Sequence, residues 1–267
     1  MNYAMVVLDL DDTLLRDDLT ISERTQASLL KAQQKGVRVV LASGRPTSSM
    51  RRYAEELELS RFGGFLISFN GAVITDCATG ETIFQKSLSR LQMGEIHDLA
   101  LAHGAGILGY HNDRIVTPKK NPWTAVESKL TGLSVEEVAD FKGLIDESSV
   151  KVIVLDEPER LAALSETLRP QVAGHMNMSL SKPFFLEFTD QGINKRESLA
   201  VLCERLEILP AAVMAVGDSY NDIGMLEFAG LAVCMGNGRD EVKAIADFVT
   251  ASNMEDGVAA AVERFVL

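Results

Sequence analysis

Five uninterrupted runs of apolar residues, each followed by glycine or polar residues, constrain the fold of this chain more than any other feature. The runs are Met5–Leu8, Val37–Ala42, Phe65–Ser68, Val213–Val216 and Leu231–Met235. Continuous runs of this kind are typical of strands buried on both faces of a parallel sheet, whereas half-exposed strands alternate apolar and polar residues. Helical patterns lie between the runs. Ser22 is a candidate cap for a helix that extends to Lys35, and Pro46 precedes a second helix over Thr47–Leu59. The alternation predicts an α/β fold with a doubly wound, Rossmann-like parallel sheet.

The middle of the chain has a different pattern. From about Gly80 to Phe188, short strand candidates stand among irregular and helical stretches. They are Thr82–Gln85, Gly106–Tyr110, Val150–Leu155 and Phe184–Phe188. Strand and helix signals resume after Gly192. Because 267 residues exceed the length of a single core of about 100–150 residues, we predict two domains. The core comprises residues 1–80 and 189–267, and an α+β domain of residues 81–188 is inserted into it.

Charge and cysteine content exclude several classes of protein. The net charge of −12 disfavours nucleic acid and anionic membrane surfaces as partners. No apolar run approaches the roughly 20 residues of a membrane span, and acidic residues stand where a signal peptide has its apolar segment. We therefore expect a cytoplasmic protein, either a monomer or a small homo-oligomer. Three widely separated cysteines predict neither a disulfide framework nor a zinc site.

Polar residues follow four of the predicted strands. The segments are Asp9-Leu10-Asp11-Asp12-Thr13, Ser43-Gly44-Arg45, Asn70-Gly71 and Gly217-Asp218-Ser219-Tyr220-Asn221-Asp222. In open α/β sheets, ligands bind at the carboxyl ends of the strands, so these segments are expected at one edge. Acids gathered there repel each other unless a cation neutralises them. All four histidines lie in the insert, so catalytic triads that use histidine are excluded in the core. The possible metal ligands in the core are then carboxylate oxygens, which favour Mg²⁺.

These residues also allow other interpretations. An isolated Asp after a strand, such as Asp218, is more often the cap of the next helix, but two acidic clusters on one edge favour a site. A Ca²⁺ loop starting at Asp9 fails because Leu14 stands where that loop needs glycine. Lys195 follows the candidate cap Asn194 at the start of a helix, where a cation opposes the helix dipole. A bound phosphate or a carboxylate would remove that conflict, while a solvated surface lysine is an equally good interpretation.

The chain resembles the haloacid dehalogenase superfamily. The four motifs of that superfamily match, in order, Asp9-x-Asp11-x-Thr13, Ser43-Gly44-Arg45, Lys195 and Gly217-Asp218-x-x-Asn221-Asp222. The insert resembles the type-two cap of its Cof-type branch. Three further segments also resemble that branch: Asn70-Gly71-Ala72, Gly192-Ile193-Asn194-Lys195 and Asn253-Met254-Glu255-Asp256-Gly257-Val258. Asp12 departs from the family, which usually has glycine at this position.

The resemblance implies a Mg²⁺-dependent phosphatase. Asp9 is then the nucleophile and a metal ligand, and Asp218 is a second metal ligand. Asp11 contributes its backbone carbonyl to the metal and its side chain as general acid and base. Asp222 holds a metal-bound water or Lys195 from behind. The residues implied to bind phosphate are Leu10 and Gly44 through their backbone N–H groups, and Ser43, Arg45, Lys195 and Asn221.

Charge counting adds a hypothesis about Asp11. The four carboxylates of Asp9, Asp11, Asp218 and Asp222 exceed the three positive charges of Mg²⁺ and Lys195. Protonation of Asp11 balances the set, so we expect this carboxyl to be protonated when substrate arrives, as a general acid must be.

Substrate choice is expected to depend on the cap. Its candidate residues are Tyr110, His111, Arg114, Lys119, Lys120 and Trp123, most of which are interpreted as surface or cap-core residues. Sugar phosphates are the leading substrate class, and phosphorylated cofactors such as pyridoxal phosphate or flavin mononucleotide come second. The alternatives are a receiver-like phosphotransfer domain, which is about half this length, and a protein that binds or senses a phosphorylated ligand without hydrolysing it.

Overall fold

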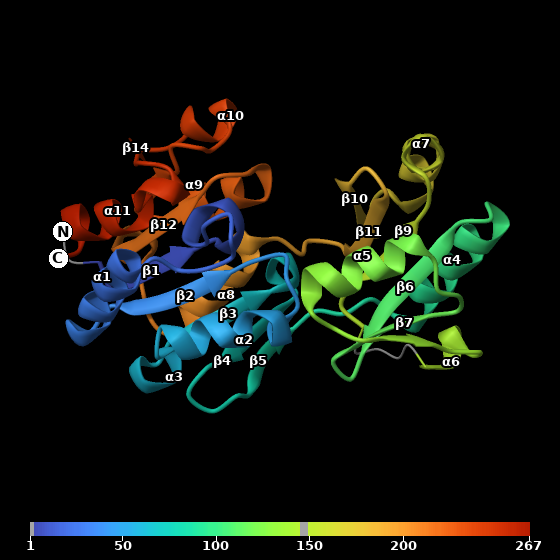
Figure 1. Cartoon of the computed structure of the whole chain (residues 1–267), viewed down its shortest axis with the longest axis horizontal. Coiled ribbons are helices and arrows are strands. Elements are labelled where there is room, and N and C mark those ends of the chain that lie inside the picture. Colours follow the sequence, from blue (N-terminus) through green and yellow to red (C-terminus); the bar gives the residue numbers. More distant parts are fainter. Residues whose placement is uncertain (1–2, 145–148) are drawn as a thin grey trace. The chain divides into compact units, whose positions relative to one another are not determined.

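The computed structural model describes residues 3–144 and 149–267 and divides into two compact units. The first unit comprises residues 1–84 and 194–267, and the second comprises residues 85–193. In Figure 1 the first unit runs from blue to teal and continues in orange and red, and the second is green through amber. The chain therefore leaves the first unit once and returns to it.

An eight-stranded sheet forms the centre of the first unit, with the order β14-β13-β12-β1-β2-β3-β4-β5. Its strands are β1 (Met5–Leu8), β2 (Arg38–Ala42), β3 (Phe65–Ser68), β4 (Val73–Asp76), β5 (Thr82–Gln85), β12 (Val213–Gly217), β13 (Leu231–Cys234) and β14 (Phe248–Val249). Strand β1 pairs in parallel with both β2 and β12, so Leu8 lies opposite Leu41 and Val216. From β1 the sheet extends through β2 on one side and through β12 on the other. The carboxyl ends at this switch point are the usual ligand site of such sheets.

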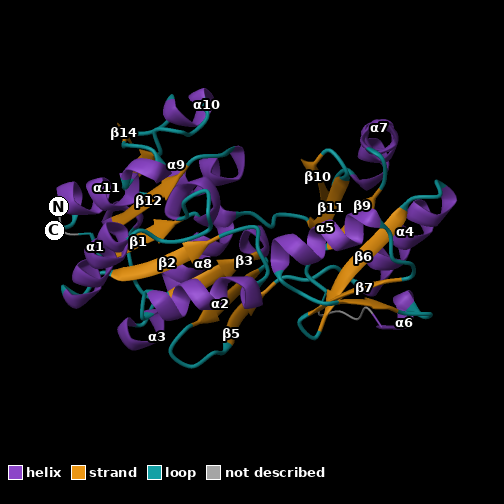
Figure 2. Cartoon of the chain, viewed as in Figure 1, coloured by secondary structure: helices purple, strands orange, loops and turns teal. Residues whose placement is uncertain are grey.

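Helices cover both faces of this sheet (Figure 2). Val6 and Leu8 face one apolar core, to which α1 (Glu23–Gln34), α2 (Thr47–Glu56) and α11 (Gly257–Phe265) contribute. Met5 and Val7 face the other, with α8 (Lys195–Arg205), α9 (Ile223–Phe228) and α10 (Asp240–Lys243). The predicted doubly wound α/β fold is confirmed. No helix among the described residues is both long enough and apolar enough to span a membrane.

The second unit contains a largely antiparallel six-stranded sheet in the order β10-β11-β9-β6-β7-β8. Its strands are β6 (Gly106–His111), β7 (Arg114–Thr117), β8 (Val135–Glu137), β9 (Val152–Leu155), β10 (Met176–Lys182) and β11 (Phe185–Asp190). The helices are α4 (Arg90–Ala102), α5 (Pro122–Thr131), α6 (Phe141–Leu144) and α7 (Pro158–Val172). Helices α4 and α7 share one apolar core with alternate residues of β6, β9 and β11.

Three elements differ from the sequence predictions. The helix expected over Thr47–Leu59 ends at Glu56, because Glu58 adopts a left-handed φ of 52° before the short helix α3 (Leu59–Phe62) begins. Strand Thr82–Gln85, expected in the insert, lies at the edge of the core sheet. Strand β11 continues beyond the expected limit of the insert to Asp190. Short edge strands carry little periodicity, so their sheet partners decide where they belong.

Candidate active site

Three acidic side chains converge at the carboxyl ends of β1 and β12. Asp9 follows β1, Asp218 follows β12, and Asp222 ends the tight turn Tyr220–Asp222. One carboxylate oxygen of each lies within 4.8 Å of the others, and all three residues are buried. Because β1 and β12 are parallel neighbours, their carboxyl ends place Asp9 and Asp218 side by side.

The buried Lys195 side chain reaches this cluster from the first turn of α8. Its Nζ donates to Asp9 Oδ1 at 2.5 Å and to Asp222 Oδ1 at 2.6 Å. Asn194 caps the helix, since its side chain accepts a hydrogen bond from the backbone N–H of Glu197. Gly71, with a φ of 107°, allows close approach, because a Cβ there would lie 2.4 Å from the Asn194 carbonyl oxygen. Lys195 is thus an internal cation and not a solvated surface residue.

Asp222 and Asp218 are held by different partners. Asp222 Oδ2 accepts the backbone N–H groups of Asp218 and Ser219, both at 3.0 Å, while Oδ1 accepts from Lys195. Both oxygens of Asp222 are therefore engaged within the protein, which fits a supporting position behind the site. Asp218 accepts from the Thr13 hydroxyl at 2.8 Å and the Ser219 hydroxyl at 2.7 Å. These neutral hydroxyls orient the Asp218 carboxylate and leave its charge uncompensated.

The electrostatics of the cluster show a deficit of positive charge. Burial, followed by repulsion from Asp222, raises the pKa of Asp9 well above its ordinary value, although Lys195 opposes the shift. Burial also raises the pKa of Asp218. Burial acts to lower the pKa of Lys195, but the carboxylates of Asp222 and Asp9 outweigh it and raise this pKa. The charged form of Lys195 is thus strongly stabilised by the carboxylates around it. Their combined negative charge still exceeds the single positive charge of Lys195.

A hard divalent cation fits this donor set. The ligand atoms available are carboxylate and carbonyl oxygens, and no histidine occurs in the first unit. An additional cation beside Asp9 and Asp218 would remove the charge deficit that burial creates. Mg²⁺ satisfies both conditions, and Asp9 and Asp218 are the side chains that would hold it.

Asp11 lies outside this buried cluster and pairs with Arg45. Arg45 Nε donates to Asp11 Oδ2 at 2.8 Å, and Arg45 Nη2 donates to Asp11 Oδ1 at 2.5 Å. A guanidinium only donates hydrogen bonds, so a bidentate pair of this kind matches an ionised carboxylate. In this structure Arg45 is therefore the partner of Asp11, and the charge count made from the sequence did not include this positive charge. The hypothesis that Asp11 is protonated when substrate arrives stays a prediction.

The remaining predicted phosphate ligands surround the same edge. Ser43 is buried directly after β2, and its Oγ accepts from the Arg45 backbone N–H at 3.2 Å. The Leu10 side chain is fully buried, so only the backbone of that residue is available to a ligand. Asn221 Nδ2 donates to Asn70 Oδ1 at 3.2 Å, and a Cβ on Gly44 would lie 3.2 Å from the Asn70 side chain. Asn70 thus links two predicted phosphate-binding segments, a role that only its place after the third strand could have suggested.

The loop geometry explains the departure at Asp12. This residue has a φ of 58°, in the left-handed region where glycine is usual and where aspartate is tolerated better than most residues. The glycine that the family usually carries here therefore meets a backbone requirement. Asp12 satisfies that requirement at some cost, and its charge contributes to raising the pKa of Asp218, behind the larger effect of burial.

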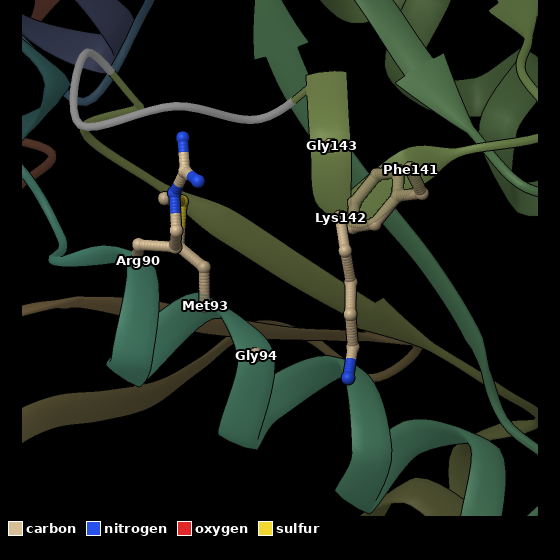
Figure 3. Close-up of a pocket in the computed structure, with 6 residues that line it drawn as sticks. All are labelled: Arg90, Met93, Gly94, Phe141, Lys142 and Gly143. Atoms are coloured by element: carbon tan, nitrogen blue, oxygen red, sulfur yellow. The ribbon is translucent and has the colours of Figure 1, made fainter.

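A cavity of about 290 Å³ lies in the second unit, between α4 and α6 (Figure 3). Its lining residues are Arg90, Met93, Gly94, Phe141, Lys142 and Gly143. In Figure 3 the Lys142 side chain extends toward α4, and its Nζ pairs with Asp98 at 2.6 Å. The lining offers no carboxylate, and its one amine is paired with Asp98, so this cavity does not compete with the acidic cluster as the site of chemistry.

The residues proposed for the cap have ordinary structural partners. Tyr110 is buried and its hydroxyl donates to Glu127. Trp123 stacks on Phe184 with a ring separation of 4.4 Å. Arg114 pairs with Glu136 at 2.6 Å, whereas Lys119 and Lys120 are exposed. Of this set, the two lysines are the cations best placed to change without disturbing the packing of the unit.

Comparison with known proteins agrees with this geometry. The haloacid dehalogenase-like hydrolase family matches residues 6–262. A 5-amino-6-(5-phospho-D-ribitylamino)uracil phosphatase of Bacillus subtilis is 34% identical over 273 residues, covering 100% of this chain and 97% of the relative. The crystal structure of a haloacid dehalogenase-like hydrolase from Bacteroides thetaiotaomicron is 37% identical, with a TM-score of 0.93, and the match covers 98% of this chain and 99% of that one. A subclass IIB sugar phosphatase shares the fold at 21% identity with a TM-score of 0.80, covering 98% of each chain. The chain belongs to the haloacid dehalogenase-like hydrolase family, and it is an enzyme of the phosphatase type.

Proposed function

We propose that this enzyme hydrolyses a phosphate monoester of a small metabolite through a phosphorylated Asp9, with Mg²⁺ bound by Asp9, Asp218 and the Asp11 backbone carbonyl. The observation that carries the proposal is the buried Asp9 carboxylate at the switch point of the sheet, 2.5 Å from Lys195 Nζ and clustered with Asp218. A buried carboxylate with its pKa raised beside a single cation is costly for folding, and such groups concentrate where chemistry uses them. Bound Mg²⁺ would supply positive charge against the phosphoryl oxygens.

The first step transfers the phosphoryl group to the protein. A carboxylate oxygen of Asp9 attacks phosphorus, the bond from phosphorus to the ester oxygen breaks, and Asp11 gives its proton to the departing alkoxide. Arg45 must release Asp11 for this donation, and the incoming phosphoryl oxygens offer the guanidinium another anionic partner. Lys195, Ser43 and Asn221, with the backbone N–H groups of Leu10 and Gly44, stabilise charge on those oxygens.

The second step returns Asp9 to its starting state. Water attacks phosphorus and loses a proton to the Asp11 carboxylate, and the bond between phosphorus and the Asp9 oxygen breaks. The products are inorganic phosphate, free Asp9 and a protonated Asp11, ready to donate to the next leaving group. A carboxylate at Asp11 is the form that would accept the proton from water, and its bidentate pairing with Arg45 supports this role.

For the substrate class we favour primary phosphate esters on polyhydroxylated carbon chains. The Bacillus subtilis relative acts on a phosphoribityl compound, which carries its phosphate on such a chain. Sugar phosphates share this chemistry, and flavin mononucleotide carries a ribityl phosphate. The proposal therefore includes sugar phosphates and flavin mononucleotide, and it disfavours pyridoxal phosphate, which carries its phosphate on the hydroxymethyl group of an aromatic ring.

The test is phosphate release from a panel of phosphorylated metabolites, with Mg²⁺ and with a chelator. We expect turnover of polyol and sugar phosphates that requires Mg²⁺. If the purified protein binds such compounds but releases no phosphate from any of them, it is a ligand-binding protein and the proposal is wrong. Undiminished release in chelator would contradict the metal assignment alone.

We also propose that the second unit selects the leaving group. Its exposed Lys119 and Lys120 are the residues to change, because their replacement should leave the packing of the unit intact. Alanine at both positions should shift relative rates across the panel and leave p-nitrophenyl phosphate hydrolysis nearly unchanged, since remote binding energy helps only substrates that possess the remote group. If the variant and the wild type have equal rates on every substrate, the residues that select the leaving group lie elsewhere in the second unit.

A further inference from the structure

Two asparagine side chains from the C-terminal part of the chain hold the loop that carries Asp11. Asn237 follows β13, and Asn253 begins the turn Asn253–Glu255 before α11. Asn237 Nδ2 donates to the Asp12 carbonyl oxygen at 2.7 Å, and Asn253 Nδ2 donates to the Leu15 carbonyl oxygen at 3.0 Å. The two are joined, because Asn237 Oδ1 accepts the backbone N–H of Asn253 at 3.0 Å. Both ends of the segment from Asp12 to Leu15 are therefore attached to one amide network.

The loop needs such external support. Its residues Leu10–Leu14 form a helical turn that is interrupted at Asp11 and Asp12, whose backbone angles are not helical. Asp12 is in the left-handed region, which relaxes readily if nothing restrains it. The Thr13 hydroxyl bond to Asp218 fixes the loop from the side of the acidic cluster, and Asn237 fixes the peptide between Asp12 and Thr13, one residue after Asp11.

We propose that Asn237, supported by Asn253, is a positioning residue for Asp11 in the hydrolysis. The inference rests on the proposed function, because it assigns Asp11 the protonation of the leaving oxygen. Asn237 does not touch the reacting atoms. It holds the Asp12 carbonyl, and through it the Asp11 backbone, so that the Asp11 carboxyl meets the ester oxygen as the bond to phosphorus breaks. Displacement of about 1 Å at such a group is enough to slow a reaction severely.

This assignment predicts a dependence on the leaving group. An alkyl alkoxide is a poor leaving group and needs the proton from Asp11, whereas p-nitrophenolate leaves without one. Misplacing Asp11 should thus reduce kcat/KM for alkyl phosphates much more than for p-nitrophenyl phosphate. A residue that only stabilised the fold would lower both equally, through the fraction of folded enzyme.

The position of Asn237 makes the experiment clean. Its side chain is exposed, so Asn237→Ala leaves no cavity, and water can solvate the Asp12 carbonyl. Asn253, which is 8% exposed, is less suitable because its replacement leaves buried groups without partners. The matched control is Gln26→Ala, which removes another amide bond to a carbonyl in the same unit: Gln26 Nε2 donates to the Glu56 oxygen at 2.9 Å, away from the site.

The experiment compares kcat/KM for glucose 6-phosphate, or the best alkyl phosphate of the panel, with that for p-nitrophenyl phosphate. For Asn237→Ala we expect the alkyl value to fall about tenfold or more, part of what a general acid contributes. We expect the aryl value to change by less than about threefold, with little change in Tm. Asn237→Asp keeps an acceptor for the Asn253 N–H but loses the donor to Asp12, so it should show the same selective loss. Gln26→Ala should leave both values unchanged.

The possible outcomes distinguish failure of the positioning role of Asn237 from failure of the proposed phosphatase function. If wild-type enzyme hydrolyses both esters but Asn237→Ala keeps their ratio, the positioning role is wrong while the proposed function stands. Equal losses on both esters, accompanied by a lower Tm, would likewise reduce Asn237 to a structural residue. If the wild-type enzyme releases phosphate from neither ester nor any other panel member, the proposed function fails and this inference with it.

Discussion

The two units of this chain bury charged groups in different ways. In the second unit a buried cation lies beside a carboxylate, with Lys151 Nζ 3.2 Å from Glu187 Oε1, and the Tyr110 hydroxyl donates to Glu127. In the first unit Lys195 pairs with both Asp9 and Asp222, and the carboxylate of Asp218 adds a third negative charge to their cluster. A buried charge beside an opposite charge is largely compensated, whereas an excess of one sign is costly. The surplus negative charge of the first unit is the charge that the chemistry proposed for Asp9 would use.

The largest expected effect is on turnover, and it should follow the loss of a carboxylate in the first unit but not in the second. Asp9→Asn removes the attacking charge and a metal ligand, so turnover should fall by more than about 10³-fold with the fold intact. The matched change in the second unit is Asp98→Asn, which removes an exposed carboxylate paired with Lys142. It should leave turnover nearly unchanged. The measurement is phosphate release together with circular dichroism, and normal turnover by Asp9→Asn would remove Asp9 from the mechanism.

A second comparison removes one buried cation from each unit. Without Mg²⁺, both Lys195→Met and Lys151→Met should lose about 3 kcal/mol of unfolding free energy. The first change leaves the buried carboxylates of Asp9 and Asp222 without their cation, and the second does the same to the partly buried Glu187. Mg²⁺ can replace the missing charge only beside Asp9 and Asp218. The rise in Tm on adding Mg²⁺ should therefore exceed that of wild type in Lys195→Met and equal it in Lys151→Met. Equal rises in all three proteins would show that the metal does not bind at the acidic cluster.

The pH dependence of stability should differ in sign between the units. The pKa of folded Asp9 is raised above the ordinary value of 3.8, so the folded state binds more protons than the unfolded state above that pH. Its contribution to stability is present below pH 3.8 and is lost as the pH rises through the folded pKa. Hydrogen bonds from Lys142 and His97 lower the pKa of Asp98, so its contribution appears as the pH rises and is lost on acidification through its folded pKa.

Melting curves in chelator from about pH 3 to about pH 7 test this difference. The gain in Tm of Asp9→Asn over wild type should grow as the pH rises, because the neutral side chain avoids burying charge. Asp98→Asn should instead fall behind wild type as the pH rises. Mg²⁺ should abolish the gain of Asp9→Asn by stabilising the ionised wild-type carboxylate. A gain that does not change with pH would contradict the raised pKa of Asp9.

The smallest expected effect concerns two aspartates with left-handed backbones, one in each unit. Asp12 has a φ of 58° and Asp113, in the turn between β6 and β7, has a φ of 56°. Glycine at either position should relieve strain and raise the unfolding free energy by up to about 1 kcal/mol. Only Asp12→Gly should also raise the Mg²⁺ concentration that gives half-maximal activity, because it removes a negative charge near Asp218. An identical Mg²⁺ dependence for both variants would show that Asp12 has no electrostatic role.

The sequence by itself determined the architecture of the core and the set of groups at its edge. Strands Met5–Leu8 and Phe65–Ser68 have the predicted bounds, and Ser22 and Asn194 cap their helices as expected. These features are local: apolar runs must be buried, and a cap bonds to an N–H group within its own first turn. The rule that parallel strands present their carboxyl ends together then placed Asp9 and Asp218 in one site, where their catalytic roles stay predictions.

Only the tertiary structure decided how those groups are paired. The bidentate bond between Asp11 and Arg45 joins residues from different strand ends, and no local pattern distinguishes this partner from a phosphate. The same holds for Asn237 and Asn253, which reach a loop more than 200 positions earlier in the chain. Strand Thr82–Gln85 belongs to the core sheet because it pairs with β4, and its own composition does not indicate this partner. Pairing depends on distances between distant segments, and those distances exist only once the sheet and its loops have formed.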